Sequence, residues 1–268
     1  MKRRFVVIGN PVGHSLSPRI HRMFAAQTGR DLEYESLQAP LDGFVRVVQS
    51  FFGSGGSGAN VTLPFKEAAC DWVTSCDEFA GCAGAVNTIV ASGAEFRGYN
   101  TDGIGLVRDL TTNLGCEIGG RRVLILGAGG AVRGIIGPLL GSSPACVVVA
   151  NRTGAKAQAL VDRFEDPRLR AANADALGRA FDIVINGTSA GLAGSMPKVP
   201  TSAIERSLVY DMVYGDNAVP FCTWARDHGA GRAVDGLGML VEQAAEAFKL
   251  FHGTRPDSAA VLRELRAA

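Results

Sequence analysis

Three polar segments near the amino terminus carry side chains that could do chemistry. They read GHSLSP at residues 13–18, ANVTLPFK at 59–66 and NTDG at 100–103. Lys66 and Asp102 together would form a pair that handles protons. Reducing a ketone with hydride leaves an alkoxide that needs a proton, and an ammonium group is a suitable donor. Taken alone, Lys66 can also be a surface lysine and Asp102 a helix cap.

The segment before Pro18 carries two hydroxyl groups, on Ser15 and Ser17. Serine followed by proline predicts a helix over residues 18–28, with Ser17 as its N-cap and proline at the first helical position. Capping needs only one of the two hydroxyls. We therefore expect Ser15 to bind a hydroxyl or carboxylate of a ligand, whereas Ser17 is equally explained as a cap.

The segment that contains Lys66 begins as a predicted strand over residues 59–63. Asn60 and Thr62 are two positions apart and therefore share one face of that strand. Pro64 then opens a predicted helix with Lys66 as its third residue. This position, just beyond the carboxyl end of a strand, is where α/β proteins bind ligands. A polar sheet face followed by a surface lysine is the alternative interpretation.

A glycine-rich turn lies between a strand and a helix in the middle of the chain. The apolar strand over residues 122–126 opens onto Gly127-Ala128-Gly129-Gly130-Ala131. Glycines at such a turn let the backbone approach a pyrophosphate, which sits at the positive end of the helix. Val132 occupies the last position of the G-x-G-x-x-G pattern, where Gly or Ala is usual. The turn in this context predicts dinucleotide binding, although a glycine-rich turn alone can be only a turn.

The end of the next strand indicates which dinucleotide binds. The strand over residues 147–150 ends in Asn151-Arg152-Thr153, and Lys156 follows one helical turn later. An Asp or Glu there would bind the ribose 2′-hydroxyl of NAD, whereas a cation suits the 2′-phosphate of NADP. We therefore predict NADP. The alternative is that Arg152 and Lys156 are solvated at a helix N-terminus, where cations are mildly unfavourable.

The composition is that of an ordinary globular protein. The 268 residues include 27 Lys and Arg and 26 Asp and Glu, giving a net charge of +1, and 47% are hydrophobic. No charge excess points to nucleic acid or to a membrane surface. The apolar run near the first residue is too short for a signal peptide. Six scattered cysteines without C-x-x-C pairs predict reduced thiols in the cytoplasm and no metal site.

Strands and helices alternate along the chain, which predicts parallel sheets with helices on both faces. The expected strands cover residues 5–8, 32–37, 59–63, 86–91, 95–99, 122–126, 147–150, 181–186 and 208–212. The expected helices include residues 18–28, 41–52, 102–114 and 239–252. We expect two α/β domains with a cleft between them, at residues 1–101 (completed by 237–268) and at 102–236.

Seven segments, in order along the chain, resemble the shikimate dehydrogenase family. They are SLSP, ANVTLPFKE, GAVNT, GYNTDGIGL, GAGGA, NRT and DGLGMLVEQAAEAF. The resemblance covers essentially the whole chain and implies the family's reaction, the NADP-linked interconversion of 3-dehydroshikimate and shikimate in aromatic amino-acid biosynthesis. It also implies an N-terminal α/β substrate domain with a mostly parallel sheet and a Rossmann-type NADP-binding domain.

The resemblance further implies roles for individual residues. It makes Lys66 and Asp102 the catalytic pair. It assigns contacts with the substrate to Ser15, Ser17, Asn60, Thr62, Asn87, Tyr214 and Gln243. It assigns contacts with the cofactor to Gly127, Ala128, Gly129, Gly130, Ala131, Asn151, Arg152, Thr153 and Lys156, and the border of the nicotinamide to Thr188, Met212 and Gly236.

Two departures and two alternative functions accompany the resemblance. Val132 and the Gly215-Asp216 pair, where a proline is common, differ from the family pattern. A quinate/shikimate dehydrogenase that uses NAD, or an amino-shikimate relative, is one alternative, and Arg152 in place of an acid counts against NAD. A non-catalytic NADP-binding regulator is the other, and it would not need Lys66 and Asp102. We expect a small-molecule substrate, no nucleic-acid or membrane partner, and a monomer or homodimer.

Overall fold

The chain folds into two compact α/β units, each built on its own sheet. The computed structural model describes residues 2–173, 177–178, 181–188 and 196–267. Unit 1 comprises residues 1–106 and 240–268, and unit 2 comprises residues 107–239. The first unit is therefore discontinuous in sequence, because the chain returns to it for its last two helices.

Unit 1 contains a six-stranded sheet in the order β2-β1-β3-β5-β6-β4. Its strands are β1 (Arg3–Gly9), β2 (Leu32–Gln38), β3 (Gly58–Val61), β4 (Ser75–Cys76), β5 (Thr88–Ser92) and β6 (Glu95–Tyr99). The helices that lie wholly or partly in it are α1 (Ser17–Thr28), α2 (Phe44–Gly53), α3 (Lys66–Trp72), α4 (Glu78–Ala83), α5 (Asp102–Arg108), α10 (Leu237–His252) and α11 (Ser258–Ala267). The sheet is mostly parallel, as predicted, but β5 runs antiparallel to both of its neighbours.

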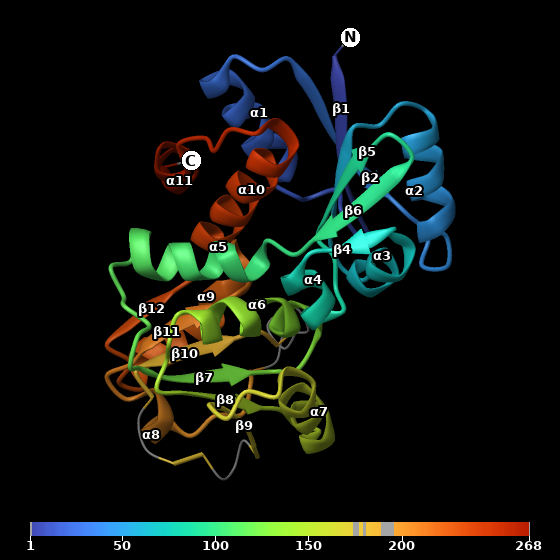
Figure 1. Ribbon diagram of the computed structural model, residues 1–268. Helices are drawn as coiled ribbons and strands as arrows, with labels where there is room; N and C mark the ends of the chain where they lie inside the picture. Colours follow the sequence, from blue (N-terminus) through green and yellow to red (C-terminus); the bar gives the residue numbers. More distant parts are fainter. Residues whose placement is uncertain (1, 174–176, 179–180, 189–195, 268) are drawn as a thin grey trace. The chain divides into compact units, whose positions relative to one another are not determined.

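The core of unit 1 explains why β1 is a continuous apolar run. Phe5 and Val7 pack in a cluster with side chains of α1, α10 and α11. Val6 and Ile8 point to the other face and pack with side chains of α2, α3 and α4. Figure 1 shows α1, α10 and α11 on one side of the sheet and α2 and α3 on the other. A strand covered on both faces needs apolar side chains at every position.

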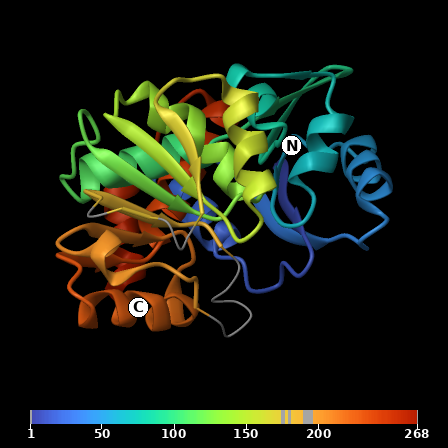
Figure 2. The same cartoon turned by 90° about the horizontal axis from the view of Figure 1, so that it is seen from below.

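Unit 2 contains a six-stranded sheet in the order β12-β11-β10-β7-β8-β9, in which all neighbours are parallel. Its strands are β7 (Arg122–Leu126), β8 (Cys146–Ala150), β9 (Leu169–Ala172), β10 (Ile183–Asn186), β11 (Leu208–Asp211) and β12 (Arg232–Val234). Its helices include η1 (Asp109–Asn113), α6 (Gly130–Gly141), α7 (Gly154–Phe164), α8 (Thr201–Ile204), η4 (Gly215–Ala218) and α9 (Val219–Asp227). Figure 2 shows these strands, coloured green to orange, side by side. The parallel order and the strand–helix alternation confirm the predicted Rossmann-type fold class.

Several element boundaries differ from the prediction. The helix expected from residue 41 begins at Phe44, because residues 40–43 form a turn in which the Gly43 amide donates to the Pro40 carbonyl. The short strands β4, β9 and β12 were not predicted, since none of them has a pronounced apolar pattern. Among the described residues, no helix has the length and apolar content needed to cross a bilayer.

Candidate active site

Lys66 and Asp102 form a largely buried ion pair in unit 1. The Lys66 Nζ atom lies 2.5 Å from Asp102 Oδ2, and the two side chains are 14% and 7% exposed. The other carboxylate oxygen, Asp102 Oδ1, accepts a hydrogen bond of 2.8 Å from Asn87 Nδ2. At this depth water screens the attraction between the charges less than it does at a surface. Asn87 is the third side chain of this group, and its hydrogen bond holds the carboxylate of Asp102 in one orientation.

The mixed sheet brings these residues together. Asn87 directly precedes β5, while Lys66 and Asp102 follow β3 and β6 by a few residues. Because β5 is antiparallel to both neighbours, its amino end lies beside their carboxyl ends. The Val86 amide donates to the Lys66 carbonyl, and the Val61 amide donates to the Asn87 carbonyl, at 2.8 Å each. The backbone itself thus fixes the relative position of the three side chains.

The predicted helix starts around this pair were wrong in detail. Lys66 is the first residue of α3, rather than the third residue of a helix that begins at Pro64. Asp102 is the first residue of α5 and is not its cap, because its carboxylate is engaged by Lys66 and Asn87. The Asp102 amide instead donates to Asn100 Oδ1 at 3.1 Å.

Asn87 is the centre of a wider buried network. Its Oδ1 atom accepts from the Thr101 amide and from the Thr88 hydroxyl, at 2.9 Å each. Its Nδ2 atom donates to Thr101 Oγ1 at 2.9 Å as well as to Asp102. These bonds leave the amide no freedom to flip, since its oxygen faces donors. Thr88 and Thr101 were not predicted as site residues, although Thr88 belongs to the GAVNT motif and Thr101 to the NTDG motif.

Gln243 joins this network from far along the sequence. Its Oε1 atom lies 3.3 Å from Thr101 Oγ1 and 3.4 Å from Asn87 Nδ2. Its Nε2 atom donates to the Leu240 carbonyl at 3.0 Å, one turn earlier in α10. A long helix of unit 1 thus presents an amide to the same network that contains the ion pair.

The remaining predicted substrate residues of unit 1 lie at or near the carboxyl ends of β1 and β3. Asn60 is buried in β3, and the Thr62 amide donates to the Ile8 carbonyl of β1 at 2.9 Å. The Ser15 hydroxyl accepts from the Ser17 amide at 3.2 Å. Ser17 was predicted as the N-cap of α1, which is wrong: Leu16 is the N-cap residue, and its side chain makes no capping hydrogen bond. Ser17 is the first helical residue and is buried.

In unit 2, the predicted cofactor residues follow the carboxyl ends of parallel strands. The glycine turn follows β7, Asn151 follows β8, Thr188 follows β10, Met212 follows β11 and Gly236 follows β12. In a parallel sheet these ends form one edge, which is the usual ligand edge of such folds. Tyr214, predicted to contact substrate, is the N-cap residue of η4 in this unit and is half-buried.

Two glycines at this edge disfavour a side chain, Gly127 through its backbone conformation and Gly236 through lack of room. Gly127 has a φ of 105°, and a Cβ there would lie 3.1 Å from the Gly187 carbonyl oxygen. A Cβ at Gly236 would lie 2.4 Å from the Met212 carbonyl oxygen. By contrast, a Cβ at Gly129 would meet nothing within 4 Å, so the turn is open on that side. The backbone is therefore closely packed at Gly127 and Gly236 and open at Gly129.

Val132 does not disturb this packing, although the sequence pattern favours a smaller residue. It is fully buried, and a Cβ at Gly187 would lie 2.5 Å from its Cγ2 atom. The valine therefore fills the space that a side chain at position 187 would otherwise occupy.

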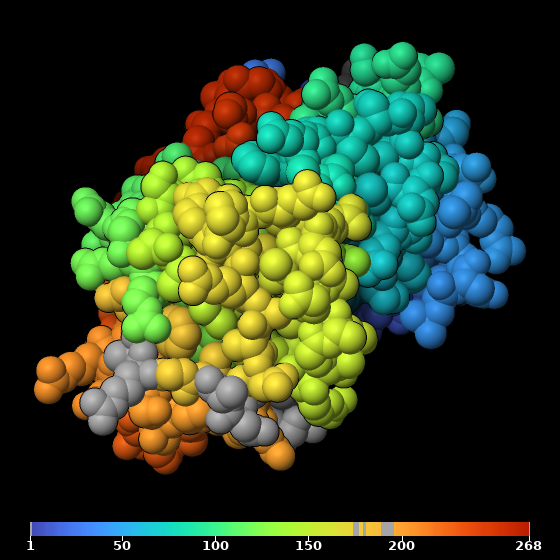
Figure 3. Space-filling model, turned by 60° about the horizontal axis from the view of Figure 1, so that its bottom comes forward, coloured from blue at the N-terminus to red at the C-terminus, as the bar shows by residue number. Residues whose placement is uncertain are grey.

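The segment after β8 presents its cations to solvent. Arg152 and Lys156 are exposed, whereas the Asn151 side chain folds back to donate to the Thr153 carbonyl at 2.9 Å. Figure 3 shows α7 and β9, in yellow, at the surface of unit 2.

Thr188, which follows β10, makes two hydrogen bonds within its own strand end. Both its amide and its hydroxyl donate to Asn186 Oδ1, at 3.1 and 2.7 Å.

Asp211 is a buried carboxyl at the end of β11, next to the predicted cofactor residues. Its Oδ1 atom accepts from Asn186 Nδ2 at 3.2 Å and from the Val213 amide at 3.1 Å. Its Oδ2 atom is buried without a partner among the described residues. Burial is the main reason that the pKa of Asp211 is raised from 3.8 to about 6.

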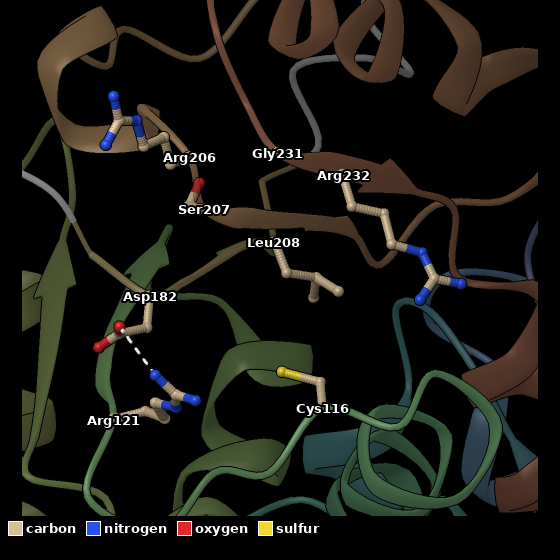
Figure 4. Close-up of a pocket in the computed structure, with 8 residues that line it drawn as sticks. All are labelled: Cys116, Arg121, Asp182, Arg206, Ser207, Leu208, Gly231 and Arg232. Atoms are coloured by element: carbon tan, nitrogen blue, oxygen red, sulfur yellow. Dashed lines mark hydrogen bonds and ion pairs between the residues drawn. The ribbon is translucent and has the colours of Figure 1, made fainter.

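A pocket of about 280 Å³ lies elsewhere in unit 2, at the amino ends of the strands. Its lining residues are Cys116, Arg121, Asp182, Arg206, Ser207, Leu208, Gly231 and Arg232. In Figure 4 the Cys116 sulfur points inward, Arg121 pairs with Asp182, and Arg206 and Arg232 extend to opposite sides. None of the residues predicted for the site lines it.

Within the described part of the chain, no group of three or more His, Cys, Asp or Glu could hold a metal ion.

Three family models match the chain along most of its length. They are the shikimate dehydrogenase substrate binding domain at residues 7–89, shikimate / quinate 5-dehydrogenase at 109–220 and the shikimate 5′-dehydrogenase C-terminal domain at 236–266. The shikimate dehydrogenase (NADP(+)) of Alkalilimnicola ehrlichii is 56% identical over 268 residues, which cover 99% of each chain.

Two solved structures resemble the fold closely. An Ael1 enzyme from Pseudomonas putida superposes with a TM-score of 0.94 at 44% identity and 98% coverage of both chains. The shikimate 5-dehydrogenase of Thermus thermophilus, solved in complex with NADP(H) and shikimate, superposes with a TM-score of 0.87 at 32% identity and 99% coverage of both. The resemblance noted in the sequence is confirmed.

Asp211 makes the stability of the protein depend on pH in a predictable direction. Because its folded pKa lies above the ordinary value of 3.8, the folded state binds this proton more tightly than the unfolded state does. The contribution of Asp211 to stability therefore falls as the pH rises from about 4 to about 6. Asp211→Asn should raise the free energy of unfolding at pH 7 by about 1–3 kcal/mol, and the gain should vanish below about pH 4.

Denaturant unfolding of both proteins at pH 4 and pH 7 measures this difference. Asp216→Asn, the same change at an exposed position in unit 2, should leave the free energy of unfolding nearly unchanged at both pH values. An equal effect of Asp211→Asn at the two pH values would contradict the assignment.

Proposed function

Because the chain belongs to the shikimate dehydrogenase family, we propose that it catalyses the reversible NADPH-dependent reduction of 3-dehydroshikimate to shikimate. The observation that carries this proposal is the buried contact of Lys66 with Asp102, held by Asn87. A protein that only binds the cofactor would have no use for a proton donor beside an oriented carboxylate. The NADP-linked name of the Alkalilimnicola relative, at 56% identity, supports the same activity here.

The residues of unit 2 fit an NADP molecule. The absence of side chains at Gly127 and the open side of Gly129 leave the backbone accessible to a pyrophosphate at the start of α6. Gly127, Ala128, Gly129, Gly130 and Ala131 would hold the pyrophosphate. Asn151, Arg152, Thr153 and Lys156 would hold the adenosine ribose and its 2′-phosphate. Thr188, Met212 and Gly236 would border the nicotinamide, which supplies or accepts the hydride.

Lys66 is the proposed proton donor in the reductive direction. As the C3 carbonyl carbon of 3-dehydroshikimate gains the hydride, its oxygen takes a proton from Lys66 Nζ. In the oxidative direction, the neutral amine accepts the proton from the C3 hydroxyl. Asp102 stabilises the ammonium form of Lys66 and orients it, because both of its oxygens are fixed by donors.

The other polar side chains have the chemistry to bind shikimate. Ser15, Ser17, Asn60, Thr62, Asn87, Tyr214 and Gln243 are proposed to bind its carboxylate and hydroxyls. Residues 1–101 with 237–268 would form the substrate domain, and residues 102–236 the NADP domain. A cytoplasmic location is also proposed, and it is supported by six cysteines that are all free thiols.

Removing the proposed proton donor should slow chemistry more than it weakens binding. Lys66→Ala should lower kcat by about 10²–10⁴-fold, the usual range for general acid–base catalysis. The dissociation constant for shikimate should change less if the contact strengthens mainly in the transition state. Steady-state kinetics and an independent binding titration separate the two effects.

The matched control for this variant is Lys249→Ala. Lys249 lies on α10, is about half exposed and pairs with Glu246 at the surface, so its loss should leave kcat unchanged. A near-normal kcat for Lys66→Ala, together with a large loss of shikimate binding, would make Lys66 an anchor and leave the proton donor unidentified.

Reversing the charge at residue 152 should weaken NADP selectively. Arg152→Asp should raise the KM for NADP by about 10–100-fold, since a charge-assisted hydrogen bond contributes roughly 1.5–3 kcal/mol. The KM for NAD should change much less, because NAD has no 2′-phosphate. Arg206→Asp makes the same charge change at an exposed site that precedes β11, far from the carboxyl ends of the strands, and serves as the control. An equal loss for both cofactors would show that Arg152 does not recognise the phosphate.

A further inference from the structure

Tyr34 is a buried tyrosine whose hydroxyl contacts one of the proposed substrate residues, Asn60. It lies in β2 and is 3% exposed. Its Oη atom donates to Asn60 Oδ1 at 2.7 Å. Burial raises the pKa of Tyr34 well above its usual range, so the hydroxyl keeps its proton and donates it to Asn60. This bond connects β2 with Asn60 in β3.

The path from Tyr34 to Asn60 crosses a strand. Tyr34 is paired with Phe5 of β1, and Phe5 is paired with Gly58 of β3, two residues before Asn60. The tyrosine therefore spans β1 to reach the opposite neighbour, a distance of about two strand spacings, roughly 10 Å. A tyrosine suits this path, because its ring is long, rigid and apolar and its tip is polar.

The ring of Tyr34 is held in place by a second aromatic ring. It stacks on His21 of α1 with ring centroids 4.2 Å apart and planes within 17°. Burial, and to a lesser extent the charge of His252, lowers the pKa of His21 to about 3, so this ring is neutral near pH 7. The stack is therefore an uncharged support that fixes the direction of the hydroxyl.

The hydrogen bonds of Asn60 leave it one unused acceptor position. Its Nδ2 atom donates to the Asn87 carbonyl at 3.2 Å and to Thr88 Oγ1 at 3.0 Å. A carbonyl can only accept, so this contact fixes which end of the amide is nitrogen. Its Oδ1 atom already accepts from Tyr34, and only the second lone pair of that oxygen remains.

We infer that Tyr34 is a positioning residue for the reaction: its hydroxyl occupies one lone pair of Asn60 Oδ1 and fixes the direction of the other, which accepts a hydrogen bond from a substrate hydroxyl. This inference rests on the proposed function and specifies the chemistry of one of its contacts. Asn60 in this state binds an O–H group and has no donor for a carboxylate or ketone oxygen. The group that Asn60 recognises is therefore a hydroxyl presented to the β3 edge.

The test compares Tyr34→Phe with the unchanged protein. Phenylalanine keeps the ring, its packing and its stack on His21, and removes only the hydroxyl. We expect the KM for shikimate to rise about tenfold, as for the loss of a hydrogen bond of about 1.5 kcal/mol. We expect kcat to change less than about threefold and the KM for NADP to stay the same.

A merely structural role would not change hydroxyl recognition. The 4-deoxy and 5-deoxy analogues of shikimate each lack one ring hydroxyl. The unchanged protein should discriminate against the analogue that lacks the hydroxyl bound by Asn60, and Tyr34→Phe should lose about tenfold of that discrimination. Tyr99→Phe makes the same chemical change at a half-buried tyrosine in the same unit and should leave all of these values unchanged.

The outcomes separate the inference from the proposed function. If the unchanged protein does not turn over shikimate, the proposed function fails and the inference falls with it. If the protein turns over shikimate and Tyr34→Phe leaves both the KM and the analogue discrimination unchanged, the inference alone is overturned. Similar increases in the KM for shikimate and the KM for NADP, together with lower thermal stability, would also overturn it. That pattern marks a structural role.

Discussion

The buried ion pair of Lys66 and Asp102 is the constraint on which the rest of unit 1 depends. Burying both charges costs desolvation free energy that their mutual attraction repays only with good geometry and further hydrogen bonds. Asn87 supplies the further bond to the carboxylate, at 2.8 Å. A hydrophobic pair of similar size would serve stability at least as well, so the value of this arrangement lies in chemistry.

The architecture of unit 1 follows from holding this pair at one edge of a sheet. A purely parallel sheet would place Asn87, which precedes β5, at the edge opposite to Lys66 and Asp102. The antiparallel β5 removes that separation, and α10 adds Gln243 after the chain has left the unit and returned. Unit 2 follows the simpler rule, since all of its predicted cofactor residues come after the carboxyl ends of parallel strands.

Much of this could be predicted from sequence because the signals are local. The glycine turn after β7 and the basic end of β8 follow from spacing alone, and the NTDG and ANVTLPFK motifs identified the ion pair. Ser17 was misassigned as a helix cap because a serine before a proline has the same pattern whether it caps or faces the core. The role of Tyr34 could not be predicted, since its contact with Asn60 crosses β1 and depends on strand order.

The most direct test of this account is a crystal structure of the protein with NADP and shikimate bound. The account predicts that the oxygen on C3 of shikimate lies within hydrogen-bond distance of Lys66 Nζ, about 3 Å, with Lys66 still paired to Asp102. It also predicts that a ring hydroxyl donates to Asn60 Oδ1. Shikimate bound with its carboxylate against Lys66, or bound away from Asn87 and Asp102, would contradict it.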